Sequence, residues 1–172
     1  MPVEPLEDDV DATARDYEWV ARAYDLARAA VQNGNHPFGA VLVSDDGKLA
    51  EYSNEVVTTR DVTRHAETGL VALASARFEP AVLSRSTLFT STEPCIMCCG
   101  AIHWAGIARV VYGVTSSLMS TAIGTPYRGI PCREVFERMD SSVTVTGPVS
   151  EADGLELHRE FWPDFLSGSA SK

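Results

Sequence analysis

Basic side chains and long apolar runs are both scarce in this chain. Lys and Arg together number 14, against 24 Asp and Glu, so the formal net charge is -10. Nucleic-acid binding draws its sequence-independent affinity from clustered Lys and Arg, and the nearest approach to such a cluster is Arg60 with Arg64. No stretch approaches the ~20 apolar residues that cross a bilayer. We therefore expect a small-molecule partner rather than a nucleic acid or a membrane.

Cysteine is also scarce, and its placement is informative. Only Cys95, Cys98, Cys99 and Cys132 are present, and the first three fall within a five-residue stretch. That layout is poor for a disulfide framework and good for metal or redox chemistry. Residues 1–11 are acidic and hold no long apolar run, unlike a signal or transit peptide. A reducing, cytoplasmic location is therefore expected.

Length and composition predict a single domain over residues 1–172. The chain is 45% hydrophobic and 22% charged, which is ordinary globular composition with enough apolar residues for a sizeable core. Residues 1–10 are acidic and contain Pro, so they are expected to form a loose lead. Residues 151–172 are expected to hold a C-terminal helix and a segment able to act as a lid.

Hydrophobic periodicity predicts helices that alternate with strands. Apolar residues recur every four positions from Trp19 to Val31, which indicates a long amphipathic helix. The expected helices cover residues 13–33, 65–77, 94–104, 132–139 and 151–162. The expected strands cover residues 39–43, 48–53, 87–91, 109–113 and 143–146, with a long loop over 115–131. This order predicts an α/β fold, a three-layer α/β/α sandwich with a central mixed five-stranded sheet.

Two short segments supply the side chains of a metal site. His65-Ala66-Glu67 and Pro94-Cys95-Ile96-Met97-Cys98 together offer one imidazole, two thiols and one carboxylate. Ligation by His65, Cys95 and Cys98 suits Zn²⁺ and leaves its fourth tetrahedral position open, as in a catalytic site. The H-x-E and P-C-x-x-C pair is the signature of zinc deaminases, in which the Glu moves protons and does not bind the metal. Glu67 is therefore the candidate catalytic residue.

Helical spacing sets a condition on this site. Cys95 and Cys98 share one face of a helix, with Pro94 expected in its first turn. His65 and Glu67 would point about 200° apart on an ideal helix, so both reach one metal only if it lies just off the helix N-terminus. We therefore expect zinc between two helix N-termini. Cys99 is also spaced to ligate beside Cys95, but adjacent helical residues diverge by about 100°, so Cys98 and Cys99 are not both expected to bind.

Other interpretations of these residues exist. A C-x-x-C at a strand-to-helix junction is typical of thioredoxin-like redox motifs, which need neither His65 nor Glu67. A closed structural zinc site would take Cys132, His103 or His158 as its fourth ligand and would leave Glu67 without a role. A zinc-stabilised scaffold without activity is a third alternative.

The motifs resemble those of the cytidine-deaminase-like superfamily. The segment 36–41 (His-Pro-Phe-Gly-Ala-Val) is similar to one in bacterial guanine deaminases, and the segment 87–106 is similar to both guanine deaminases and tRNA adenosine deaminases. The resemblance implies zinc, hydrolytic deamination and a homodimer. It also implies that the substrate contacts Asn54 and the backbone N–H of Ala66, with Phe38 and Trp104 lining the pocket, although both aromatic residues suit a core as well.

The same resemblance leaves the substrate open. Arg64, directly before His65, departs from the related families, and the region after Gly113 matches none of them closely. Our first hypothesis is a deaminase of a free nucleobase or similar heterocycle, most like guanine deaminase. In that case the segment 161–165 would close the pocket, and Asp164 would bind a ring N–H; otherwise its aromatic residues pack the last helix. The alternative is a tRNA adenosine deaminase, for which a basic arm is lacking.

Overall fold

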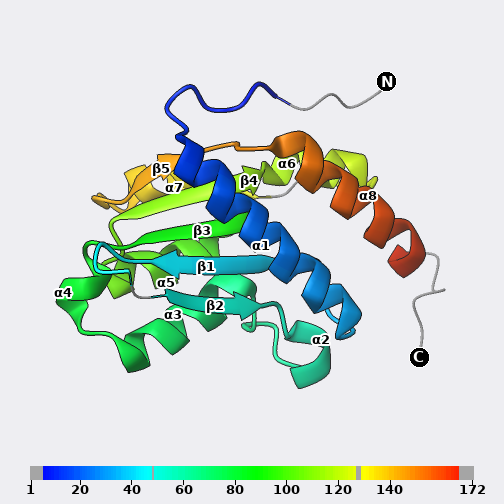
Figure 1. Cartoon of the computed structure of the whole chain (residues 1–172). Helices are drawn as coiled ribbons and strands as arrows, with labels where there is room; N and C mark the ends of the chain where they lie inside the picture. Colours follow the sequence, from blue (N-terminus) through cyan, green and yellow to red (C-terminus); the bar gives the residue numbers. More distant parts are fainter. Residues whose placement is uncertain (1–5, 48, 127–128, 167–172) are drawn as a thin grey trace.

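Figure 1 shows a computed structural model of the chain, which describes residues 6–47, 49–126 and 129–166. The strands are β1 (Gly39–Val43), β2 (Leu49–Ser53), β3 (Thr87–Thr92), β4 (Arg109–Val114) and β5 (Thr144–Thr146). They form one sheet in the order β2-β1-β3-β4-β5. β1 pairs antiparallel with β2 and β3, whereas β3, β4 and β5 run parallel. The predicted mixed five-stranded sheet is confirmed.

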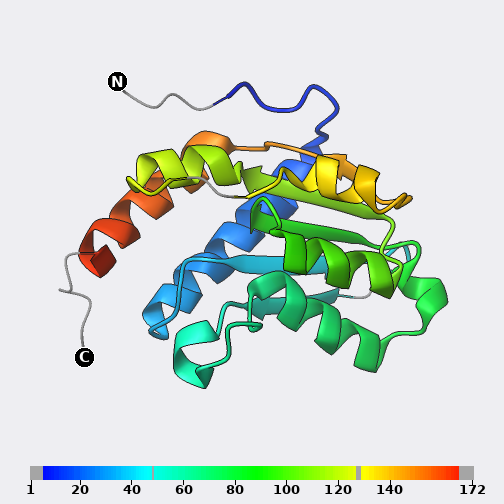
Figure 2. The ribbon, with the colours of Figure 1, turned by 180° about the vertical axis from the view of Figure 1, so that it is seen from behind.

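Helices cover both faces of this sheet. They are α1 (Ala14–Gln32), α2 (Val56–Thr59), α3 (Ala66–Arg77), α4 (Pro80–Leu83), α5 (Ile96–Ala105), α6 (Ser116–Ala122), α7 (Cys132–Arg138) and α8 (Glu151–Leu166). α1 and α8 lie on one face (Figure 1), and α3, α5 and α7 lie on the other (Figure 2). The predicted three-layer sandwich is therefore confirmed. None of the helices in the described ranges has the length and apolar content to cross a membrane.

α1 is fixed to the sheet by its first turn and by a close approach to β1. The Thr13 side chain accepts from the Asp16 N–H, and the Asp16 carboxylate accepts from the Thr13 N–H, which is a capping box. Asp16 is 1% exposed and pairs with Arg109 of β4 at 2.8 Å. Gly39 permits the approach, because a Cβ there would lie 2.4 Å from the Ala23 carbonyl oxygen.

Three short helices, α2, α4 and α6, depart from the expected pattern. α6 lies inside the segment 115–131, which was expected to be a loop. The Thr115 side chain accepts from the Leu118 N–H and caps this helix. Seven residues are too few for a helical period to stand out among Ser and Thr. Residues 127–128 of this segment, and Lys48 of the expected second strand, lie outside the described residues.

Residues 6–10 also differ from expectation, because polar contacts hold them in place. The Asp9 N–H donates to the Pro148 carbonyl at 2.9 Å, and the Asp9 carboxylate accepts from Gly147 and Arg133. The Leu6 N–H donates to Glu151 at 2.6 Å. The acidic side chains that suggested a loose lead are themselves the anchors of this segment.

Candidate metal centre and active site

His65 and Cys95 each precede a helix. His65 is the N-cap of α3, with ψ 158, and Cys95 is the N-cap of α5, with ψ 169. The expected helices at 65–77 and 94–104 therefore begin one and two residues late, and Pro94 lies before the cap. Because His65 has an extended backbone, its side chain does not follow the roughly 100° per residue spacing of the helix. His65 and Glu67 can therefore both point to the space just off the N-terminus of α3. This meets the condition that the sequence set for a shared metal.

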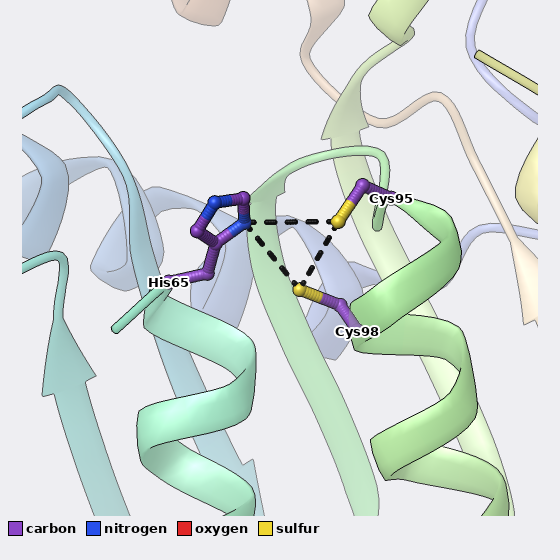
Figure 3. Close-up of side chains that lie close together, drawn as sticks. All are labelled: His65, Cys95 and Cys98. Atoms are coloured by element: carbon purple, nitrogen blue, oxygen red, sulfur yellow. Dashed lines mark hydrogen bonds between the residues drawn. The ribbon is translucent and has the colours of Figure 1, made fainter. Parts of the chain in front are cut away.

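The side chains of His65, Cys95 and Cys98 converge between the starts of α3 and α5 (Figure 3). Nδ1 of His65 lies 3.7 Å from each Sγ, and the two Sγ atoms lie 3.6 Å apart. Zn–S bonds of about 2.3 Å and Zn–N bonds of about 2.0 Å at tetrahedral angles require an S–S separation of roughly 3.8 Å and S–N separations of roughly 3.5 Å. The observed distances therefore fit three ligands of a tetrahedral zinc ion.

The pKa values of the two cysteines in the triangle, Cys95 and Cys98, are shifted in opposite directions. The hydrogen bond with Cys98, followed by that with His65, lowers the pKa of Cys95 to about 4. The same hydrogen bond between the two cysteines, followed by burial, raises the pKa of Cys98. His65 has a raised pKa, chiefly because of its hydrogen bond with Cys95. Before zinc binds, a thiolate at Cys95 thus faces a thiol at Cys98, and metal binding displaces the thiol proton.

Glu67 lies against this triangle without belonging to it. It is 5% exposed, and its Oε1 accepts a hydrogen bond from the Thr90 hydroxyl at 2.8 Å. Its Oε2 lies 3.4 Å from the Cys98 sulfur. Burial raises the pKa of Glu67. One carboxylate oxygen is thus anchored to β3, and the other faces the ligands.

The residues named as alternative ligands lie in other contacts. Cys99 and Cys132 are fully buried outside the triangle, and the Cys99 sulfur lies 3.5 Å from the Pro94 carbonyl oxygen. His103 bonds Ser141, and His158 bonds Thr92. Within the described ranges, His65, Cys95 and Cys98 form the group of three that fits a metal. The closed structural site therefore lacks its fourth ligand.

A cavity of about 140 Å³ opens beside the ligands. The residues that line it are Phe38, His65, Glu67, Thr92, Glu93, Cys95, Ser116 and Met119. A larger cavity of about 470 Å³, lined by residues such as Arg28 and Phe161, holds none of the metal ligands. The smaller cavity is therefore the candidate active site, because metal ligands and Glu67 line it and its volume does not decide the question.

Two of the predicted substrate contacts lie next to this cavity. Asn54 is 1% exposed, and its backbone N–H donates to the carbonyl of Phe38, a lining residue. The Val56 N–H donates to Asn54 Oδ1, which fixes the orientation of the amide. Among the described residues, Asn54 Nδ2 has no hydrogen-bond partner. Ala66 is the first residue of α3, so its N–H has no acceptor within the helix.

Trp104 and Arg64 do not reach the cavity. Trp104, which was expected in the pocket or the core, is 85% exposed near the end of α5 and is absent from the cavity lining. Eight residues beyond the start of α5, it lies about two turns away from Cys95 along the helix. The Arg64 side chain pairs with Asp61 at 3.4 Å on the surface.

Four lining residues were absent from the predicted site: Thr92, Glu93, Ser116 and Met119. Glu93 follows β3 directly, and its carboxylate accepts from the Ser116 N–H at 3.0 Å and the Cys132 N–H at 2.8 Å. It thereby fixes the starts of α6 and α7 beside the cavity. The Glu next to Pro94 was visible in the motif, but its partners lie 23 and 39 residues away, so no local pattern shows its role.

Comparisons with known proteins agree with this geometry. Residues 13–114, more than half of the chain, match the family model of the cytidine and deoxycytidylate deaminase zinc-binding region. A probable cytosine deaminase of Schizosaccharomyces pombe is 31% identical over 88% of this chain and 95% of its own length. Guanine deaminase of Bacillus subtilis is 42% identical over 55% of this chain and 61% of its own. Several tRNA-specific adenosine deaminases are also similar.

A solved structure gives the same result in three dimensions. Guanine deaminase from Nitrosomonas europaea superposes with a TM-score of 0.72 at 26% identity, over 95% of this chain and 96% of that one. The redox interpretation of Cys95 and Cys98 gains no support from these matches, because family model and fold both point to a metal-dependent hydrolase. The chain belongs to the cytidine and deoxycytidylate deaminase zinc-binding family and is a zinc-dependent hydrolytic deaminase acting on a C–N bond.

Proposed function

We propose that this enzyme deaminates a free nucleobase or a related amino-substituted heterocycle, with a guanine-deaminase-like preference, and releases ammonia. The observation that carries the proposal is the small cavity beside the ligands. Phe38 of its wall packs against His158 and Trp162 of α8 with tilted rings, whose centroids lie 5.4 and 6.3 Å from that of Phe38. A cavity of about 140 Å³ backed by these rings suits one planar ring system. The net charge of -10 favours a small substrate over a polyanion.

Glu67 moves the protons in the proposed reaction. Zinc held by His65, Cys95 and Cys98 would lower the pKa of a water molecule and prepare it for attack. In the overall reaction one water replaces the amine: its oxygen stays on the ring carbon, the C–N bond breaks, and ammonia leaves. Glu67 would carry the first water proton to a ring nitrogen and the second to the leaving amine, and would end the cycle as the carboxylate. The hydrogen bond from Thr90 keeps one carboxylate oxygen still while the other transfers protons.

Two groups are proposed to orient the ring. Asn54 Nδ2 donates to a ring acceptor, because its Oδ1 is already engaged with Val56. The free N–H of Ala66 donates to an exocyclic carbonyl. The segment 161–165 is proposed to act as a lid, and the support for it is the contact of the half-buried Trp162 with Phe38 of the cavity wall. The side chain of Asp164, the proposed reader of a ring N–H, lies outside the part of the chain whose side chains are described.

The enzyme is proposed to act as a homodimer in the cytoplasm. The dimer follows from the family resemblance, and Trp104 offers a marker for it. An indole that is 85% exposed on one copy would bury a large apolar area if a second copy covered it. Covering it with a second copy would account for an aromatic residue that reaches neither core nor cavity.

The first experiment measures ammonia release by the zinc-loaded protein. The panel holds guanine, cytosine, adenine, their nucleosides and aminotriazines, and Glu67→Gln is the matched control because it keeps the shape and removes the base. Release from a free base that falls about 10²- to 10⁴-fold in the control supports the proposal. Activity only on nucleosides, or none at one zinc per chain, refutes it.

The alternative, tRNA adenosine deamination, is favoured by the similarity to tRNA-specific enzymes. The test of this alternative uses a transcript of an anticodon stem-loop as the substrate. Inosine formation that weakens steeply with added salt would establish it, since phosphate contacts carry such binding.

A further inference from the structure

His158 is a fully buried histidine on α8 whose two ring nitrogens both have partners. Its Nε2 lies 2.9 Å from the hydroxyl oxygen of Thr92, at the end of β3. Its Nδ1 lies 3.1 Å from the indole Nε1 of Trp162, one turn further along α8. The His158 side chain is 0% exposed. The contact between His158 and Thr92 joins positions 66 residues apart.

These partners determine which nitrogen carries the proton. An indole N–H can only donate, so Trp162 requires a lone pair at Nδ1 of His158. A neutral imidazole then carries its hydrogen on Nε2 and donates it to Thr92. Burial lowers the pKa of His158 to about 4, which keeps the ring neutral near pH 7. The hydrogen bond from the Trp162 indole and the burial of the ring therefore both favour the neutral form of His158.

The Thr92 hydroxyl is left with a proton to donate. A hydroxyl offers one hydrogen and two lone pairs, and His158 occupies a lone pair. Within the described ranges, His158 is the partner of the Thr92 hydroxyl. Thr92 is only 3% exposed, yet it lines the cavity together with His65 and Glu67. Its remaining hydrogen is therefore available to a molecule that fills that cavity.

We propose that Thr92 is a substrate-contacting residue that donates a hydrogen bond to the ring, and that His158 is the positioning residue that fixes it as a donor. The proposal rests on the proposed function and deepens it. The matching group on the substrate is an acceptor, either an unprotonated ring nitrogen or an exocyclic carbonyl oxygen. A ring that presents only C–H at that point binds more weakly, because a site built for a hydrogen bond rejects analogues that lack it.

The test begins with Thr92→Val, which keeps the branched shape and removes the hydroxyl. On the base that the wild type deaminates best, kcat/KM falls about 10- to 100-fold, mainly through KM. Thr92→Ser restores the hydroxyl and recovers most of the loss. Thr87→Val is the control, at the opposite end of β3 and absent from the cavity lining. Zinc content and thermal midpoint are measured for every variant.

His158 is tested through its coupling to Thr92. His158→Leu removes the donor and raises KM about as much as Thr92→Val. The double variant is no worse than either single variant, because both remove the same hydrogen bond. His158→Gln returns an amide donor and rescues KM in part. A merely structural role would lower the thermal midpoint without moving KM, and its kinetic effects would add to those of Thr92→Val.

The outcomes separate the two levels of the proposal. An active wild type with an unchanged Thr92→Val, or with additive effects of the two sites, overturns the inference and leaves the nucleobase function intact. A wild type that neither deaminates any free base nor binds one in calorimetry removes both.

Discussion

Two groups of residues at the cavity are built in different ways. The metal side consists of His65, Glu67 and Cys95, which line the cavity, and of Cys98. The α8 side consists of the lining residues Phe38 and Thr92 and, packed against them, His158 and Trp162 of α8. On the metal side, all four residues sit at the cap or in the first turn of a helix, so local backbone geometry aims them. On the α8 side, contacts between distant segments fix each group. The metal side is thus set by local sequence, whereas the α8 side depends on the whole fold.

The sharpest way to break the metal side is Cys95→Ala. We expect zinc to fall from one per chain to almost none, because two protein ligands remain of three, and deamination to drop more than about 10³-fold. Elemental analysis after dialysis and the ammonia assay measure both. Cys99→Ala is the matched control, since Cys99 is buried outside the triangle. If Cys99→Ala also released zinc, the ligand set derived from the triangle would be wrong.

Asn54 is bonded to Phe38 of the α8 side and gives the next largest expected effect. Asn54→Ala removes both the acceptor for Val56 and the proposed donor to substrate, so KM should rise about 10- to 100-fold with some loss of stability. Asn54→Asp keeps the acceptor and lacks the donor. We expect it to bind substrate as poorly as the Ala variant and, because its carboxylate is buried, to have a lowered thermal midpoint. Normal KM in Asn54→Asp would show that the amide nitrogen does not contact the ring.

The two sides also differ in how far the sequence predicted them. The H-x-E and C-x-x-C spacings predicted the metal side, because each spacing is read within one short segment. Periodicity likewise predicted the five strands and the long helices. The α8 side was predicted only in part. Phe38 followed from a resemblance, and Trp162 lies in the segment 161–165 that was expected to close the pocket or to pack the last helix. His158 was considered only as an alternative zinc ligand. Its bond to Thr92 spans 66 positions, and no spacing rule reaches that far.

Trp104 shows the opposite failure. The resemblance suggested a pocket residue and its apolar nature suggested a core residue, yet it is 85% exposed. Trp104 lies about two turns beyond the start of α5, and residue type alone does not show whether a side chain at that point faces the core or the solvent. α6 was missed for a related reason, since a capping Thr115 and seven residues carry too little periodicity.

The buried His158 makes the α8 side sensitive to acid. Its pKa of about 4 in the folded chain lies below the usual value of 6.5, because of burial. Between these values the unfolded chain binds a proton that the folded chain excludes, so stability falls as pH drops from 6.5 toward 4. Between pH 7.5 and pH 5 the loss is roughly 2 kcal/mol. Denaturant unfolding of wild type and His158→Leu at both pH values isolates this part, and equal pH dependence in the two proteins would contradict it.

Trp104 should matter least to a single chain and most to its assembly. On an exposed helix face, Trp104→Glu is expected to change the free energy of unfolding of a monomer by no more than ~0.5 kcal/mol. If a second copy covers this indole, the same charge is buried without a partner and the dimer dissociates. Sedimentation measures the mass, with Val10→Glu as the control at another exposed apolar position, 97% exposed. If Trp104→Glu leaves the dimer unchanged, the interface lies elsewhere. If the dimer dissociates and the single chains remain active, both sides of the cavity are complete within one chain.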